Sequence, residues 1–173
     1  MSLLLVLISD NLSGQSLRLP NEGYNQCVGT AISTGVFIDK PAWFLGLSVD
    51  YAYIIGERWI LLGGLAIDRE TKTEVSEGER KTVTTLTPNF AVGYAFSRRF
   101  AVGAGVGKGF WDTDNEEEKM KFTTKGNLTV GILCSYTIYM KGPHGIDITG
   151  GLERGLITPE TNVTIEFGYA LSF

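Results

Sequence analysis

The eleven residues 163–173 alternate strictly between large apolar side chains and small or polar ones. The apolar positions are Val163, Ile165, Phe167, Tyr169, Leu171 and Phe173. A period of two predicts a β-strand with two unlike faces, and about ten residues suffice for a tilted strand to cross the hydrocarbon core of a bilayer. Because one whole face is apolar, we expect lipid on that side of the strand.

The composition agrees with a small membrane barrel and disfavours two other classes. The 173 residues, enough for one domain, include 22 Gly, 9 Phe and 7 Tyr but only 5 Pro. Small barrels have Gly where the interior is crowded and aromatic rings near the lipid interfaces. No apolar run approaches the roughly 18 to 20 residues that a membrane-spanning helix needs. The net charge of −4 and the scattered Lys and Arg disfavour nucleic acid as a partner.

The same alternation predicts eight strands along the chain. Their ranges are 27–38, 43–55, 59–67, 83–96, 100–109, 122–140, 146–157 and 163–173. Short turns follow the second, fourth and sixth strands, and charged loops at 68–81 and 112–121 follow the third and fifth. We expect the seventh strand to be the least regular. The pattern predicts an all-β, eight-stranded antiparallel up-and-down transmembrane β-barrel with both termini on the periplasmic side.

Aromatic residues gather at the expected ends of these strands, where they would form girdles at headgroup depth. The interface aromatics that we expect are Trp43, Tyr51, Tyr53, Trp59, Tyr94, Phe96, Phe100, Phe110, Tyr136 and Tyr169. The alternative is a soluble eight-stranded barrel with its apolar face inward. That alternative is disfavoured because a small interior could not hold so many large rings while Gly faced outward.

Residues 1–24 stand apart from the predicted barrel domain at 25–173. The apolar run 3–8, followed by small residues through Gly14 and Ser16, is similar to the end of a secretory signal. A basic segment before the apolar run is missing. We interpret residues 1–24 either as a signal-peptide remnant or as a periplasmic N-terminal extension.

The architecture, turn lengths and terminal strand resemble the small eight-stranded outer-membrane barrels of OmpA and OmpX type, over roughly residues 27–173. The resemblance implies a bacterial outer-membrane location. It also implies contact with outer-membrane lipid and lipopolysaccharide, and recognition by the barrel-assembly machinery. The residues that would form the assembly signal are Phe167, Tyr169, Leu171 and Phe173. We expect a monomer. This chain differs from the members that bind host surfaces, because only its second and third expected outer loops are long.

Few residues suggest catalysis, and we predict no enzyme, metal site or cofactor. His144 is the single histidine and lies in an expected turn beside Pro143 and Gly145, so a general base paired with a serine nucleophile is disfavoured. A lipid A-modifying enzyme, which the resemblance would allow, is therefore the third hypothesis. Cys27 and Cys134 fall on non-neighbouring strands, so we expect two free thiols.

Several charged residues are expected to point into the lumen. The predicted charge network comprises Asp50, Lys125, Asp147, Arg154 and Glu166. Charges inside a narrow tube must be paired or solvated, so this network would plug the barrel. The alternative is a narrow gated pore for ions or small solutes. The acidic loop 112–119 could in addition bind a surface ligand or bridging divalent cations. We therefore predict a structural or adhesion-like outer-membrane protein with a plugged lumen.

Overall fold

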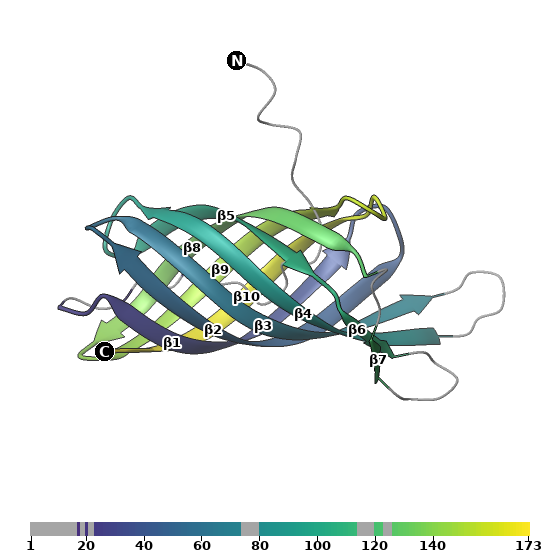
Figure 1. The fold of residues 1–173 in the computed structure, drawn as a ribbon, viewed down its shortest axis with the longest axis horizontal. Coiled ribbons are helices and arrows are strands. Elements are labelled where there is room, and N and C mark those ends of the chain that lie inside the picture. Colours follow the sequence, from purple (N-terminus) through teal and green to yellow (C-terminus); the bar gives the residue numbers. More distant parts are fainter. Residues whose placement is uncertain (1–16, 18–19, 21–22, 74–79, 114–119, 123–125) are drawn as a thin grey trace, which may run out of the picture.

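The chain folds into a closed antiparallel β-barrel without helices in its described part (Figure 1). The computed structural model describes residues 17, 20, 23–73, 80–113, 120–122 and 126–173. The barrel strands are β1 (Gln26–Phe37), β2 (Ala42–Ile55), β3 (Trp59–Thr73), β4 (Arg80–Ala95), β5 (Phe100–Lys108), β8 (Leu128–Lys141), β9 (His144–Gly155) and β10 (Thr161–Ser172). The predicted eight-stranded up-and-down barrel is confirmed. Within these ranges no helix is both long and apolar enough to cross a membrane.

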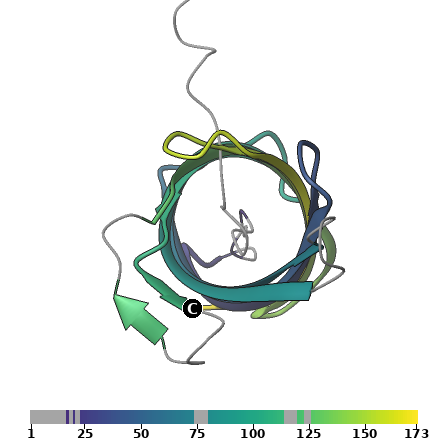
Figure 2. The same ribbon diagram turned by 90° about the vertical axis from the view of Figure 1, so that its right-hand side faces the viewer.

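The barrel closes because the first strand pairs with the last. Strand β1 pairs with β2 on one side and with β10 on the other, in a ladder that runs from Cys27 opposite Ser172 to Phe37 opposite Asn162. The pairing of β3 with β4 completes the ring. The view along the barrel shows the resulting closed wall (Figure 2).

Each strand presents unlike faces to the two sides of this wall, as the period of two predicts. Along β2, inward residues such as Gly46 and Ala52 alternate with exposed Leu47 and Tyr51. Strand β10 shows the same alternation over its full length, and Phe167 on its outer face is 58% exposed. Apolar residues therefore cover the outside, and small or polar residues fill the inside.

The short turns gather at one end of the barrel, which we call the short-turn end. Residues 56–58 join β2 to β3, residues 96–99 join β4 to β5, and residues 142–143 join β8 to β9. Gly56 and Gly142 adopt φ values of 66° and 57°, a left-handed conformation that costs glycine little and other residues more. The short turns predicted after the second, fourth and sixth barrel strands are confirmed.

The loop predicted at 68–81 is mostly strand. Strands β3 and β4 stay paired as far as Thr73 opposite Arg80. Asp68 points inward and is 8% exposed. The prediction was wrong because charge was taken as a sign of solvent, whereas continued pairing with the Thr-rich start of β4 keeps this segment in the sheet.

The charged stretch after β5 also contains secondary structure. The short strands β6 (Trp111–Thr113) and β7 (Met120–Phe122) form a hairpin that pairs with β4 at the end opposite the short turns. Residues 120–122 therefore belong to this hairpin, and the next barrel strand begins at Leu128 rather than at 122.

The irregular strand is β8, and the prediction that the seventh barrel strand would be the least regular is wrong. Strand β9 alternates throughout. In β8 the register shifts between Thr137 and Tyr139, so that Ile138 and Tyr139 are both exposed. A bulge of this kind inserts one extra residue and bends the strand.

Candidate functional site

The interior of the barrel is the candidate site, and its short-turn end is apolar. The buried side chains that pack together there are Leu17, Cys27, Ala52, Ile60, Leu62, Ala91, Ala95, Ala101, Leu133 and Ala170. Most of these residues lie within a few positions of the strand ends at this end of the barrel. This apolar layer is a cluster of packed side chains in the lumen near the short turns.

Leu17 also belongs to this layer, although it precedes β1 and is not part of a barrel strand. Its side chain is fully buried. A Cβ on Gly93 would lie 2.6 Å from Leu17 Cδ2, and a Cβ on Gly103 would lie 2.6 Å from Leu17 Cδ1. The two glycines of β4 and β5 therefore leave the space that Leu17 occupies. Of residues 1–24, the structure also describes Pro20, which is buried, and Gly23 and Tyr24, which are exposed.

Five carboxylates also point into the lumen, some at the level of the apolar layer and others farther from the short turns. They are Asp50, Asp68, Asp147, Glu153 and Glu166, and each is at most 8% exposed. Ser48 Oγ donates to Asp50 Oδ2 at 3.2 Å, and Thr149 Oγ1 donates to Ser135 Oγ at 3.0 Å. The polar part of the lumen is thus built from acids, hydroxyls and amides that come from most of the strands.

Four of these acids face a glycine on a neighbouring strand. The register pairs are Asp50 with Gly64, Asp68 with Gly46, Asp147 with Gly168, and Glu153 with Gly131. A Cβ on Gly64 would lie 2.9 Å from Asn89 Oδ1 and 2.8 Å from Val49 O, and closer still to Asp50 Oδ1. The inward glycines therefore make room for acidic side chains in a narrow interior.

The structure changes the predicted charge network. Asp50, Asp147 and Glu166 lie inside the barrel, but Arg154 is exposed on the outer face. Arg154 has the opposite parity to Asp147 and Glu153 along β9, so it cannot share their side of the sheet. Lys125 lies outside the described residues. The prediction missed Asp68 and Glu153, although the strict alternation of inward positions could have found Glu153.

At the opposite end of the barrel, a lysine joins two connections. Lys40, from the β1–β2 connection, forms ion pairs with Glu70 at 2.7 Å and with Glu160. Its Nζ also lies 3.9 Å from the ring centroid of Phe37. Nearby, Asp39 Oδ2 accepts a hydrogen bond from Thr161 N at 2.7 Å. These contacts hold β1, β3 and the β9–β10 connection together.

The predicted interface aromatics lie on the outer face or at the ends of the strands. Trp43, Tyr51, Tyr53, Trp59, Phe96, Tyr136 and Tyr169 are exposed, and Tyr94, Phe100 and Phe110 are partly buried. The proposed assembly residues Phe167, Tyr169, Leu171 and Phe173 are exposed on one face of the last strand and just beyond its end.

Four aromatic rings form a row at the short-turn end, on β3, β4, β5 and the turn between the last two. Ring centroids are 5.3 Å apart for Trp59 and Tyr94, 5.1 Å for Tyr94 and Phe96, and 6.0 Å for Phe96 and Phe100. Arg58 Nη1 donates to Tyr94 Oη at 3.2 Å. This hydrogen bond raises the pKa of Arg58 above its ordinary value, so the group stays cationic.

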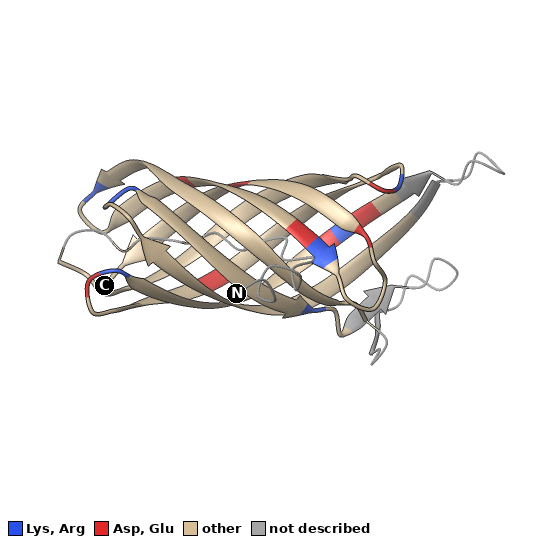
Figure 3. Ribbon diagram, turned by 90° about the horizontal axis from the view of Figure 1, so that it is seen from above, with Lys and Arg blue, Asp and Glu red and all other residues tan. Residues whose placement is uncertain are grey.

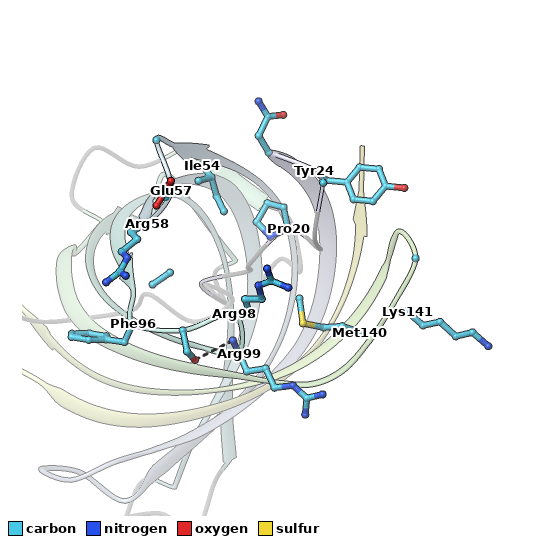
Figure 4. Close-up of a pocket in the computed structure, with 16 residues that line it drawn as sticks. Pro20, Tyr24, Ile54, Glu57, Arg58, Phe96, Arg98, Arg99, Met140 and Lys141 are labelled. Atoms are coloured by element: carbon cyan, nitrogen blue, oxygen red, sulfur yellow. Dashed lines mark hydrogen bonds between the residues drawn. The ribbon is translucent and has the colours of Figure 1, made fainter.

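A cavity of about 790 Å³ opens at the centre of the short-turn end (Figure 4). Pro20 and Ile54 form part of its inner lining, and Arg98 extends across the opening toward Pro20. Arg99 and Lys141 point away from it. The cavity is a vestibule below the apolar layer.

The histidine and the two cysteines considered in the sequence analysis do not come together in one site. His144 Nδ1 lies 2.5 Å from Tyr169 Oη in an exposed pair. Cys27 is buried in the lumen and Cys134 is exposed on the outer face, and neither cysteine forms a disulfide. Over the described ranges, no group of three or more His, Cys, Asp and Glu residues is arranged to hold a metal ion.

A closed eight-stranded barrel with an apolar outer face and a polar interior is the fold of the small outer-membrane β-barrel proteins. Neisserial surface protein A, NspA, matches with a TM-score of 0.60 and 11% identity, over 87% of this chain and 97% of that one. Ail, the attachment invasion locus protein of Yersinia pestis, matches with a TM-score of 0.50 and 13% identity, over 86% of this chain and 97% of that one.

The likeness to these proteins lies in the fold. No protein-family model matches the chain, and no curated protein matches it in sequence.

Proposed function

We propose that the chain is an integral barrel of the bacterial outer membrane with a structural or adhesion-like role and a lumen closed by side chains. The observation that carries this proposal is the apolar layer at the short-turn end, where Leu17 fills the space between Gly93 and Gly103. Packed apolar side chains leave little room for water, so passage through the barrel would require rearrangement of this layer.

The outer surface supports the placement in a membrane. Large apolar side chains such as Leu47, Ile32 and Phe167 are more than half exposed there, whereas soluble monomers rarely expose continuous apolar patches of this extent. NspA and Ail have the same fold. In this placement the lipid, lipopolysaccharide and barrel-assembly machinery are the expected partners, with both termini in the periplasm and the protein a monomer.

The adhesion-like part of the proposal draws on the loops and on one neighbour. The name of Ail describes it as an attachment protein, and the end of this barrel opposite the short turns carries the β6–β7 hairpin and the extended β3–β4 hairpin. Replacing residues 113–119 with Gly and Ser should weaken the adhesion to a surface of whole cells that carry the protein. Unchanged binding would count against an adhesive role for this loop.

The closed lumen is tested by conductance. The refolded protein in planar bilayers should give no channel events, and vesicles that contain it should not swell in small sugars. A porin in the same lipid provides the positive control. Folding is checked by the altered mobility of unheated barrels on SDS gels.

A narrow pore is the alternative, and the five buried carboxylates of the lumen are the observation that favours it. Discrete channel events from pure wild-type protein, selective for cations and reduced by Asp50→Asn or Glu166→Gln, would replace the closed-lumen proposal with this one.

A further inference from the structure

Aromatic and basic side chains form a continuous surface at the short-turn end, outside the lumen. We define the short-turn patch as Arg58, Trp59, Tyr94, Phe96, Arg99 and Phe100. Three strands and two turns contribute to it. Trp59 is 55% and Phe96 61% exposed, so their rings face whatever surrounds the barrel. Aromatic rings at this position suit the boundary between headgroups and acyl chains.

Contacts within the patch and its turns hold the side chain of Arg58 and the backbone of Arg99. The Arg58 guanidinium lies 6.0 Å from the centroid of the Tyr94 ring and donates to its hydroxyl. In the next turn, Ser97 Oγ accepts hydrogen bonds from the backbone N–H groups of Arg99 and Phe100, at 3.2 and 3.1 Å. Arg99 O also accepts from Thr137 N at 2.8 Å. The Arg58 guanidinium and the backbone from which the Arg99 side chain extends are therefore held in place.

A shallow groove lies on the outer face of β4, β5 and β8. It has a volume of about 300 Å³, and its lining includes Phe90, Val92, Ala104, Val106 and Val130. Ala104 is paired with Val92 on one side, and its small side chain leaves a hollow between larger neighbours. The side chains that line the groove are apolar, as an acyl chain requires.

The spacing between patch and groove fits one leaflet. Ala104 follows Phe100 by four residues, which is about 13 Å along a strand. A strand tilt of about 45° makes this roughly 9 Å of depth. Half of a hydrocarbon core is about 15 Å, so Ala104 lies at a depth that the acyl chain of a lipid with its headgroup at the turns would reach.

The turns at this end carry more positive than negative charge. Among the described turn residues and the strand end beside them, the charged side chains are Arg58, Arg98, Arg99, Lys141 and Glu57 (Figure 3). We propose that the short-turn patch and the groove together bind an anionic phospholipid, with its phosphate on Arg58 and Arg99 and one acyl chain over Ala104. This site rests on the proposed placement in the bilayer.

Trp59 gives a direct test, because it lies inside the patch. In a Trp43→Phe/Trp111→Phe protein, Trp59 is the remaining tryptophan of the chain. Refolded into phosphatidylcholine vesicles, it would be quenched by increasing fractions of dibrominated phosphatidylglycerol or dibrominated phosphatidylcholine. The relative quenching constant should favour the anionic lipid by roughly fivefold for an engaged arginine. Equal quenching by the two lipids would overturn the proposal.

Variants distinguish the contribution of the arginine charges to the lipid preference from that of the groove. Arg58→Gln/Arg99→Gln should abolish the preference, and each single replacement should remove part of it, so the test does not depend on the double variant folding. The matched control, Arg69→Gln/Arg154→Gln, removes two exposed arginines from elsewhere on the barrel and should leave the preference unchanged. Ala104→Leu fills the hollow without altering charge and should reduce the preference.

The remaining outcomes identify other occupants. Inorganic phosphate, added at constant ionic strength, should not displace the lipid; if it abolishes the preference, the site binds a small anion instead. A cross-linked dimer that covers the groove would replace the lipid with a second copy of the chain. Both results differ from the conductance result that decides whether the lumen is closed.

Discussion

Gly93→Ala should destabilise the barrel by about 1–3 kcal/mol, and Leu17→Ala should remove this cost. A Cβ at Gly93 would lie 2.6, 3.2 and 3.4 Å from Cδ2, Cδ1 and Cγ of Leu17, and these are its three nearest atoms. Leu17 is fully buried, so it cannot move aside into solvent. The penalty therefore depends on a single opposing side chain.

A double-mutant cycle gives the expected size of the coupling. Leu17→Ala alone should cost about 2–5 kcal/mol through the cavity that it leaves. In that background the Gly93→Ala methyl group enters vacant space, and replacement of a strand glycine gains about 0.5–1 kcal/mol. The difference between the two backgrounds predicts a coupling of about 1.5–4 kcal/mol.

The assay is guanidinium unfolding of the barrel in phospholipid vesicles, followed by tryptophan fluorescence. Gly103→Ala is the matched control, because its Cβ would also lie 2.7 Å from Val92 O and 2.9 Å from Gly93 Cα. Backbone atoms do not yield when Leu17 is shortened, so this variant should remain costly in both backgrounds. If Gly93→Ala costs the same with and without Leu17, the contact inferred for Leu17 does not exist in the folded protein.

Two further variants and one spin label probe the lumen, a loop and the lipid face. Gly64→Ala should cost about 1–3 kcal/mol in the same unfolding assay, because its Cβ would overlap Asp50; a neutral result would contradict the tight fit. A nitroxide on exposed Cys134 should be relaxed more by oxygen than by a water-soluble nickel chelate, and the reverse would place that face in water. Asn127 holds the loop 156–158 through three hydrogen bonds of 3.0–3.1 Å, so Asn127→Ala should speed hydrogen exchange there, and unchanged exchange would refute the role assigned to this side chain.

The alternation of side chains was enough to predict the fold and the facing of most strands. Along β2 and β10 each side chain points either into the lumen or out of the barrel. Because apolar residues alternate regularly with small or polar ones, the sequence shows which side each residue faces. The short turns followed from Gly56 and Gly142, whose conformations suit glycine. These signals are local, so one sequence can reveal them.

The errors arose where charge competed with pairing or where a distant segment contributed. Asp68 was assigned to a loop because it begins a charged stretch, but the partner strand keeps it in the sheet. Arg154 was predicted to face the lumen because it is charged, although its position in the alternation along β9 points outward. Gly93 and Gly103 leave space in the lumen, but no local sequence pattern indicates that Leu17 fills it.

The seam between β1 and β10 sets the order in which this barrel can form. Its partners Cys27 and Ser172 are 145 positions apart, whereas the strands beside the short turns are joined by a few residues. Closing so long a loop costs roughly 2–3 kcal/mol more than closing a ten-residue hairpin, so the seam should form after the hairpins. Until it forms, both edge strands expose backbone groups that lipid cannot satisfy. Partly closed barrels are therefore poor resting states in a bilayer, and insertion and closure should proceed as one cooperative event.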